Sequence, residues 1–238
     1  MPLTSEAPAA PGRYALPADS KAGKRLLYGA ATHWLALCCA VIGSYVGLAV
    51  SPAVLLKLGF VRTAALLYRL YWPVCHQFAY RSWFLFGAHF YYAADEFKLL
   101  TGIDPYTAAG RLASKSFVGD AVLGYKLALC ERDIAIYGGM LLASLAYAAL
   151  RFSGREVAPL HWLGYGLLGI VPIALDGVSQ LLSQPPFDFF GLALRESTPL
   201  LRSLTGALFG IANVWMAYPH LEVWMQVVRE DLEIFTGA

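Results

Sequence analysis

Long runs without charged residues alternate along the chain with short polar segments. Four runs contain no Asp, Glu, Lys or Arg, and they cover 26–56, 134–150, 157–175 and 203–221. A bilayer core about 30 Å thick is crossed by a helix of roughly 20 apolar residues, which matches these lengths. The runs lack the alternation of barrel strands, and in lipid a helix satisfies its own backbone hydrogen bonds. The pattern predicts an all-α integral membrane protein with about four transmembrane helices, at 33–56, 133–151, 158–182 and 199–219.

The connection at 57–132 is long and rich in aromatic residues. Within 60–72, Arg62 and Arg69 are seven residues apart and share one helical face, which predicts a helix lying along the membrane surface. The segment 78–94 is apolar, but its length of about 17 residues and its polar side chains argue against a fifth crossing. We therefore expect interfacial or re-entrant helices in this connection.

Positive charges indicate the orientation. Lys24 and Arg25 precede the first predicted span, while Arg151 and Arg155 lie between the second and third. Lys and Arg in short loops stay on the cytoplasmic side of a membrane. We therefore expect a multi-pass protein of the cell membrane with both its N- and C-terminal ends in the cytoplasm.

The chain is expected to divide into a disordered cytoplasmic tail at 1–25, rich in Pro and Ala, and a single helical membrane domain at 26–235. An inserted surface segment at about 88–126 interrupts the domain, and Asp104-Pro105 predicts a helix start within it. Its charged residues indicate a solvated or surface-lying segment; they are Arg111, Lys115, Asp120 and Lys126. This segment is a candidate contact for a partner in a membrane complex.

Composition supports a lipid environment and excludes other classes. Only 14% of the 238 residues are charged, against about 25% in soluble proteins. A net charge of +2 without a basic stripe excludes a nucleic-acid partner. Of the four cysteines, Cys38 and Cys39 are adjacent within the first predicted span, which is not the spacing of a secreted disulfide framework.

Unusual polar residues gather at one end of the predicted spans. An even number of crossings brings them to the same outer membrane level. The stretches are Cys75-His76-Gln77 with Arg81, Cys130-Glu131-Arg132-Asp133, Asp176 with Gln180, and Arg202 with Thr205. Because a carboxylate near the centre of a span costs about 2.5–3.5 kcal/mol, Asp176 should be paired or face a wet cavity. Arg132 or Arg202 is the expected partner, and an ion pair that only joins two helices is the alternative.

The cysteines in these stretches suggest metal chemistry. Cys130 and Asp133 are three residues apart, so on a helix they point to one side, and thiolates and carboxylates both bind metals. Cys75 or His76 would supply a third ligand, and such a set suits zinc better than magnesium. Two other interpretations stay open for the same atoms, since Cys75 and Cys130 could form a structural disulfide or act as redox-active thiols.

Glycine patterns in the spans indicate helix packing. Gly164, Gly166 and Gly169 fit the dinucleotide-binding pattern GxGxxG, but no strand precedes them and they lie in an apolar span. Close helix contact explains them better, as it explains Gly206 and Gly210, four residues apart.

The ordered set of polar motifs resembles a family of uncharacterised prokaryotic membrane proteins, known only as a domain of unknown function. The resemblance covers roughly residues 73–210 and implies a small helical membrane protein without a known activity. The motifs are Cys75-His76-Gln77 with Arg81-Ser82, Cys130-x-Arg132 with Tyr137-Gly138, Asp176-Gly177-x-x-Gln180, Arg195-x-Ser197 and Arg202-x-x-Thr205-Gly206.

Two departures from the family pattern bear on the site. The family commonly has a further cysteine where this chain has Asp133, and a carboxylate can replace a thiolate at a metal but cannot form a disulfide. The family also keeps its Cys-His-Gln and Cys-x-Arg motifs close together, whereas about 88–126 is inserted between them here. A short link implies that both motifs lie on one membrane side.

The leading hypothesis is a zinc-like metal centre at the outer face of a hydrolase that acts on an anionic lipid head group. The metal would activate water, and Asp176 would be a further ligand or a general base. Arginines would hold the anion, and the candidates are Arg81, Arg132, Arg195 and Arg202. The alternatives are a metal-ion or small-anion transporter with Asp176, Gln180 and Arg202 along its pathway, a thiol redox protein, and a structural accessory subunit that docks through 88–126.

Overall fold

The computed structural model describes residues 21–184, 187, 191 and 193–236. The chain forms two compact units, Met1–Trp34 with Trp224–Ala238, and Leu35–Val223. Most of the predicted tail at 1–25 lies outside the described residues, and 21–25 are the first residues of a helix.

Four helices among the described residues are long and apolar enough to cross a membrane. They are α1 (Lys21–Lys57), α5 (Glu131–Phe152), the continuous helix Trp162–Leu182, and α8 (Pro199–Thr236). The third consists of α6 (Trp162–Gly164), η2 (Tyr165–Ile170) and α7 (Val171–Leu182). Each predicted span corresponds to one of these helices, although the third begins at Trp162, four residues after its predicted start at 158. The prediction of a helical integral membrane protein with four crossings is confirmed.

The first helix begins earlier than its apolar run predicts. Residues before His33 are helical, and His33 itself has non-helical dihedral angles, φ −108° and ψ 17°. The predicted start at residue 33 therefore coincides with a kink. In the first unit, Tyr28 of α1 donates a hydrogen bond of 3.0 Å to Glu233 Oε1 of α8.

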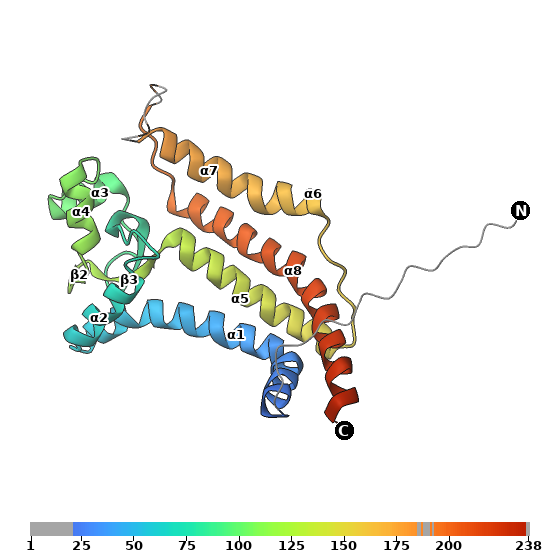
Figure 1. Ribbon diagram of the computed structural model, residues 1–238. Helices are drawn as coiled ribbons and strands as arrows, with labels where there is room; N and C mark the ends of the chain where they lie inside the picture. Colours follow the sequence, from blue (N-terminus) through green and yellow to red (C-terminus); the bar gives the residue numbers. More distant parts are fainter. Residues whose placement is uncertain (1–20, 185–186, 188–190, 192, 237–238) are drawn as a thin grey trace, which may run out of the picture. The chain divides into compact units, whose positions relative to one another are not determined.

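In the second unit, α5 lies between α1 and α8 (Figure 1). A Cβ atom built on Gly210 of α8 would lie 2.1 Å from the carbonyl oxygen of Ile136 in α5, and one on Gly206 would lie 2.7 Å from that of Arg132. Gly169 similarly faces Ala212 of α8, whose Cβ would be 2.9 Å from an added Cβ. The predicted packing role is confirmed for these three glycines, because no side chain fits between the helices there. It is wrong for Gly164 and Gly166, since an added Cβ would meet only the Leu160 side chain at Gly164 and no atom within 4 Å at Gly166.

The 57–132 connection combines short helices with a small sheet. Its helices are α2 (Val61–Tyr71), η1 (Ala79–Arg81), α3 (Ala94–Thr101) and α4 (Ala108–Ser116). Its strands are β1 (Ser82–Leu85), β2 (Gly119–Asp120) and β3 (Gly124–Cys130). They form an antiparallel sheet in the order β1-β3-β2, with Ser82 opposite Cys130.

The helix predicted at 60–72 is present as α2, but 78–94 differs from the prediction. Instead of an interfacial or re-entrant helix, it contains the 3₁₀ turn η1, strand β1 and a loop. The burial of β1 alternates along Ser82–Leu85, as expected for aromatic and apolar residues on a half-buried strand. The segment is apolar because its side chains pack in a hydrophobic core within the 57–132 connection.

Residues 78–130 form a packed α/β lobe with its own hydrophobic cluster, which includes Tyr80, Phe84, Tyr92 and Phe97. The segment expected to be an inserted surface piece, 88–126, therefore contributes to a core. The predicted helix start at Asp104 is wrong. The N-cap of α4 is Thr107, whose side chain accepts from Gly110 N, because Asp104 instead closes a turn by accepting from Tyr106 N at 3.0 Å.

Lys126 is fully buried in β3, contrary to the prediction that its charge marks a solvated segment. Its Nζ donates to the carbonyl oxygens of Gln77 at 2.6 Å, Lys115 at 2.7 Å and Ser114 at 3.4 Å. Burial lowers the pKa of Lys126 to about 7. The side chain therefore ties β3 to α4 and to the segment after α2.

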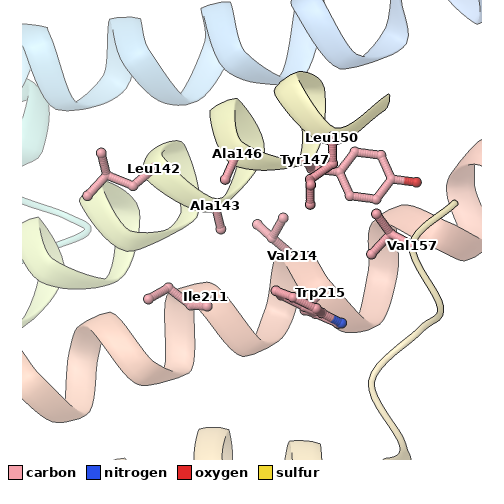
Figure 2. A pocket seen from close by; sticks show the side chains of 9 residues that line it. All are labelled: Leu142, Ala143, Ala146, Tyr147, Leu150, Val157, Ile211, Val214 and Trp215. Atoms are coloured by element: carbon pink, nitrogen blue, oxygen red, sulfur yellow. The ribbon is translucent and has the colours of Figure 1, made fainter. Parts of the chain in front are cut away.

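The spanning helices also border an apolar cavity of about 260 Å³, between α5 and α8 (Figure 2). Its lining is Leu142, Ala143, Ala146, Tyr147, Leu150, Val157, Ile211, Val214 and Trp215. Apart from Val157, which lies between α5 and α6, these residues are in the C-terminal half of α5 and in α8, away from the polar start of α5. None of the metal-ligand candidates lines this cavity.

Candidate functional site

The four polar stretches meet at one end of the second unit, around a cavity of about 330 Å³. The segment after α2, the start of α5, the end of α7 and the start of α8 each contribute residues to its wall. The lining is Val74, Cys75, His76, Phe78, Arg81, Cys130, Arg132, Asp133, Gly177, Gln180, Leu181, Gln184 and Arg202. The convergence expected from four crossings is therefore present in the fold.

Cys75, Cys130 and Asp133 form a compact cluster on this cavity. One ligand atom from each, the two Sγ atoms and a carboxylate oxygen, lie within 4.8 Å of one another. Cys75 follows α2, while Cys130 ends β3 and leads into α5, which carries Asp133 in its first turn. Both cysteines are free thiols. His76, the other ligand candidate, is exposed on the cavity wall but is outside this cluster.

Local contacts hold the two cysteines side by side. The backbone N–H of Cys75 donates to Tyr71 O at 3.1 Å, which extends the end of α2 to this residue. The backbone N–H of Cys130 then donates to Cys75 Sγ at 3.3 Å. A side-chain hydrogen bond to Cys75 that favours the protonated thiol, together with burial, raises the pKa of Cys130 well above its usual value.

Asp176 is engaged at both carboxylate oxygens. Oδ2 accepts from Arg132 Nη2 at 2.5 Å, and Oδ1 accepts from Arg195 Nη2 at 2.9 Å and from Ser197 Oγ at 2.7 Å. Of the two expected partners, Arg132 is the one that it binds. The Asp176 side chain is only 2% exposed and does not line the cavity.

Arg202 pairs with carboxylates on other segments. Its Nη1 donates to Glu131 Oε2 at 2.9 Å, and both side chains are almost fully buried. Its Nη2 binds Glu196. Within the described residues, Arg202 Nε, Arg132 Nε and Glu131 Oε1 are buried atoms without a hydrogen-bond partner. The guanidinium of Arg202 therefore retains an unused donor beside the cavity that it lines.

Glu196 is the central acceptor of this network, although none of the predicted site residues includes it. Arg81 donates to its two oxygens at 2.6 and 2.7 Å, and Gln180 and Gln184 donate at 2.8 and 2.9 Å. Burial opposes the charge on Arg81, but the hydrogen bond and charge of Glu196 raise the pKa of Arg81 above its usual value. The sequence did contain a signal that a further acceptor was needed. The arginines predicted at this membrane level outnumber the carboxylates predicted there, so one more carboxylate partner was to be expected.

Two predicted polar-site residues have local structural contacts instead of facing the cavity. Gln77 is buried and donates to Tyr68 O at 2.8 Å, with a positive φ of 55°. Thr205 Oγ1 donates to Leu201 O at 2.8 Å within α8. Neither residue lines the cavity, whereas Arg81, Arg132 and Gln180 do.

The comparisons with known proteins agree with the membrane fold. Residues 109–216 match the family described as "Predicted membrane protein (DUF2085)". The chain is also 26% identical over 153 residues to "Uncharacterized protein MJ1492" of Methanocaldococcus jannaschii, covering 64% of this chain and 67% of that protein. No solved structure matches the chain.

The family match includes Cys130, Asp133, Asp176 and Arg202 but begins after Cys75. It supports the resemblance inferred from the sequence motifs and assigns no activity. Four membrane-spanning helices and the family description together give a multi-pass location in a lipid bilayer. The chain is an integral membrane protein whose residues 109–216 match a family of uncharacterised membrane proteins.

Proposed function

We propose that this protein is a metal-dependent hydrolase that removes phosphate from an anionic lipid head group, with a zinc-like ion bound by Cys75, Cys130 and Asp133. The observation that carries the proposal is the cluster of their ligand atoms, within 4.8 Å of one another, on a cavity that arginines also line.

The donor set fits zinc chemistry. Two thiolates and one carboxylate are ligands that zinc accepts, whereas magnesium prefers oxygen ligands. Three protein ligands leave a fourth position for water, which is the arrangement of catalytic zinc sites. A zinc-bound water has a pKa lowered to about 7 in such sites, so it is a nucleophile at neutral pH.

The arginines on the cavity suit a phosphate substrate. Arg81, Arg132 and Arg202 all contribute to the wall, and the guanidinium group binds phosphate oxygens in a planar, two-pronged geometry. The unused Nε donors of Arg132 and Arg202 add to this capacity. In the proposed reaction, water attacks phosphorus, the bond to the lipid oxygen breaks, and inorganic phosphate and the lipid alcohol leave.

Asp176 acts in this proposal as a positioning residue. Its oxygens are engaged by Arg132, Arg195 and Ser197 and its side chain is off the cavity wall, which supports a positioning role over that of a ligand or a general base. It instead fixes the direction of Arg132 toward the cavity. Cys75 takes the ligand position for which His76 was the alternative, because Cys75 belongs to the cluster.

The depth of the cavity supports a lipid substrate. It is lined by residues at the start of α5, the end of α7 and the start of α8, which are the ends of membrane-spanning helices, where head groups lie. Lys24 and Arg25 just before the first span, with Arg151 and Arg155 in the short loop after α5, support placing the opposite end, and with it the cavity, at the outer face of the membrane.

Metal content tests the proposal directly. We expect about one zinc per chain in the purified protein by elemental analysis. Cys130→Ala and Asp133→Ala should lose this zinc and the release of phosphate from vesicles that contain phosphatidic acid. Cys39→Ala, a cysteine remote from the cluster within α1, is the matched control and should keep both. Unchanged zinc content in both cluster variants, or no zinc binding by the unmodified protein, would contradict the proposal.

A thiol redox function is the second candidate, and the proximity of Cys75 and Cys130 favours it. Two neighbouring thiols on an oxidising face can exchange with a disulfide. Thiol labelling with and without reductant separates the candidates. A redox pair would be protected until reduced, whereas zinc ligands would become reactive on adding a chelator.

A further inference from the structure

One carboxylate, Glu196, is bound by several polar side chains of the cavity wall near the metal-ligand cluster. Glu196 accepts hydrogen bonds from Arg81, Gln180, Gln184 and Arg202, and all four donors line the cavity. We propose that these four side chains form the phosphate subsite of the protein, and that Glu196 fills it as an internal competitor until a phosphate displaces it. This inference rests on the proposed function and names how that site binds its anion.

The donor geometry is that of an anion-binding site. Arg81 approaches both oxygens of Glu196 through Nε and Nη2, the two-pronged arrangement that guanidinium groups make with carboxylates and phosphates. Gln180 donates from the last turn of α7, Gln184 donates from just after that helix, and Arg202 donates from α8. Three separate elements thus direct donors at one acceptor group, and a phosphate has the same acceptor chemistry with more oxygens.

Glu196 is suited to leave this position. It lies in the segment between α7 and α8, outside any helix or strand, so its departure breaks no regular hydrogen-bond ladder. Its neighbours are held independently, since Arg195 and Ser197 both bind Asp176. Its side chain is partly accessible, at 16% exposure, as is that of Arg81 at 21%. Rotation of one side chain would therefore open the subsite while the segment stays attached to α7.

One hydrogen-bond donor of the subsite has no acceptor while Glu196 is bound there, so Glu196 does not satisfy the whole subsite. Arg202 is only 3% exposed, yet its Nε has no acceptor among the described residues. Buried donors are nearly always paired in folded proteins, so an unpaired one beside a cavity points to a further ligand. A phosphate, with three terminal oxygens instead of two, offers the additional acceptor.

The charge balance supports a phosphate monoester. The arginines of the network, Arg81, Arg132, Arg195 and Arg202, face the carboxylates of Glu131, Asp176 and Glu196. When Glu196 turns away, four positive charges face two negative ones. The surplus of two matches the charge that a phosphate monoester approaches at neutral pH.

Binding of inorganic phosphate to the purified protein, measured by calorimetry, tests the inference. Glu196→Gln keeps the size of the side chain and removes its charge, so it should bind phosphate more tightly than the unmodified protein. If Glu196 fills the subsite nine-tenths of the time, the gain is about tenfold. Glu222→Gln is the matched control, because Glu222, like Glu196, pairs with an arginine, here Arg151, but neither of these two residues lines the cavity. This variant should leave phosphate affinity unchanged.

A second variant keeps the test decisive if Glu196→Gln folds poorly. Arg81→Lys retains the charge but not the two-pronged geometry, and it should weaken phosphate binding at least about fivefold. Unchanged phosphate affinity in Glu196→Gln, or in Arg81→Lys where only that variant folds, would overturn the inference and leave a purely structural ion pair. The measurements are repeated after removal of metal by a chelator. A gain that persists without metal supports the subsite even if the protein binds no zinc, so the two proposals fail separately.

Discussion

The contact between α5 and α8 makes a sharp prediction about two glycines. Gly210 of α8 faces the backbone of α5, whereas Gly138 of α5 has no atom within 4 Å of an added Cβ. Both lie inside long helices, where Ala is intrinsically better than Gly by about 1 kcal/mol. Gly210→Ala and Gly138→Ala therefore share the same gain in helix propensity and differ in the interhelical contact.

The magnitude follows from the geometry. An added Cβ on Gly210 would lie 2.1 Å from Ile136 O, so α8 must move by about 0.9 Å to reach even the tightest contact that real Cβ atoms make, 3.0 Å. Overpacking of this kind costs about 1–3 kcal/mol. Arg202 lies eight residues before Gly210, about 12 Å along the helix, so the shift also strains its pair with Glu131.

Thermal unfolding of the detergent-solubilised protein, followed by tryptophan fluorescence, measures the difference. For a chain of this length, 1 kcal/mol corresponds to about 2–4 °C in Tm. We expect Gly138→Ala to melt slightly above the unmodified protein and Gly210→Ala to melt several degrees below Gly138→Ala. Equal melting temperatures for the two variants would refute the close backbone contact between α5 and α8.

Two further predictions concern buried charges. The pKa of Lys126, lowered to about 7 by burial, lies below that of an unfolded lysine, near 10.4, so the unfolded state binds more protons between these values. Stability should therefore rise with pH above 7, by up to about 1.4 kcal/mol per unit, and Lys126→Met should lose this slope in denaturant titrations at pH 7 to 9; parallel curves for both proteins would contradict it. Asp176→Asn should destabilise the protein by about 3 kcal/mol, because it leaves Arg132 and Arg195 without a charged partner, while zinc content stays unchanged. Loss of zinc in this variant would instead make Asp176 a metal ligand.

The positions of the spanning helices could be predicted because they depend on local properties. A run without charged residues, long enough to cross the bilayer, is visible in the sequence without knowing its neighbours, and each run corresponds to an observed helix. Convergence of the polar stretches followed from the number of crossings alone. The sequence could therefore predict that Cys75, Cys130 and Asp133 lie near one another.

The α/β lobe was not foreseeable by the same reasoning. Strand β3 is buried on both faces over most of its length, so it lacks the alternation that marks a strand, and its partner β1 lies more than 40 residues earlier. Lys126 in β3 has the sequence signature of a solvated position. Its burial depends on three carbonyl oxygens that only the folded lobe brings to its Nζ.

The sequence by itself determined the membrane class, the four spans and the end of the bundle where polar residues collect, because hydropathy, helix length and crossing number are properties of the chain. The tertiary structure decided which charges pair, since Arg132 binds Asp176 while Arg202 binds Glu131 and Glu196. It also showed Glu196 as the shared acceptor of several side chains that line the cavity. The physical reason is that ion pairing depends on distances of a few ångströms between side chains of different helices, and helix packing sets those distances.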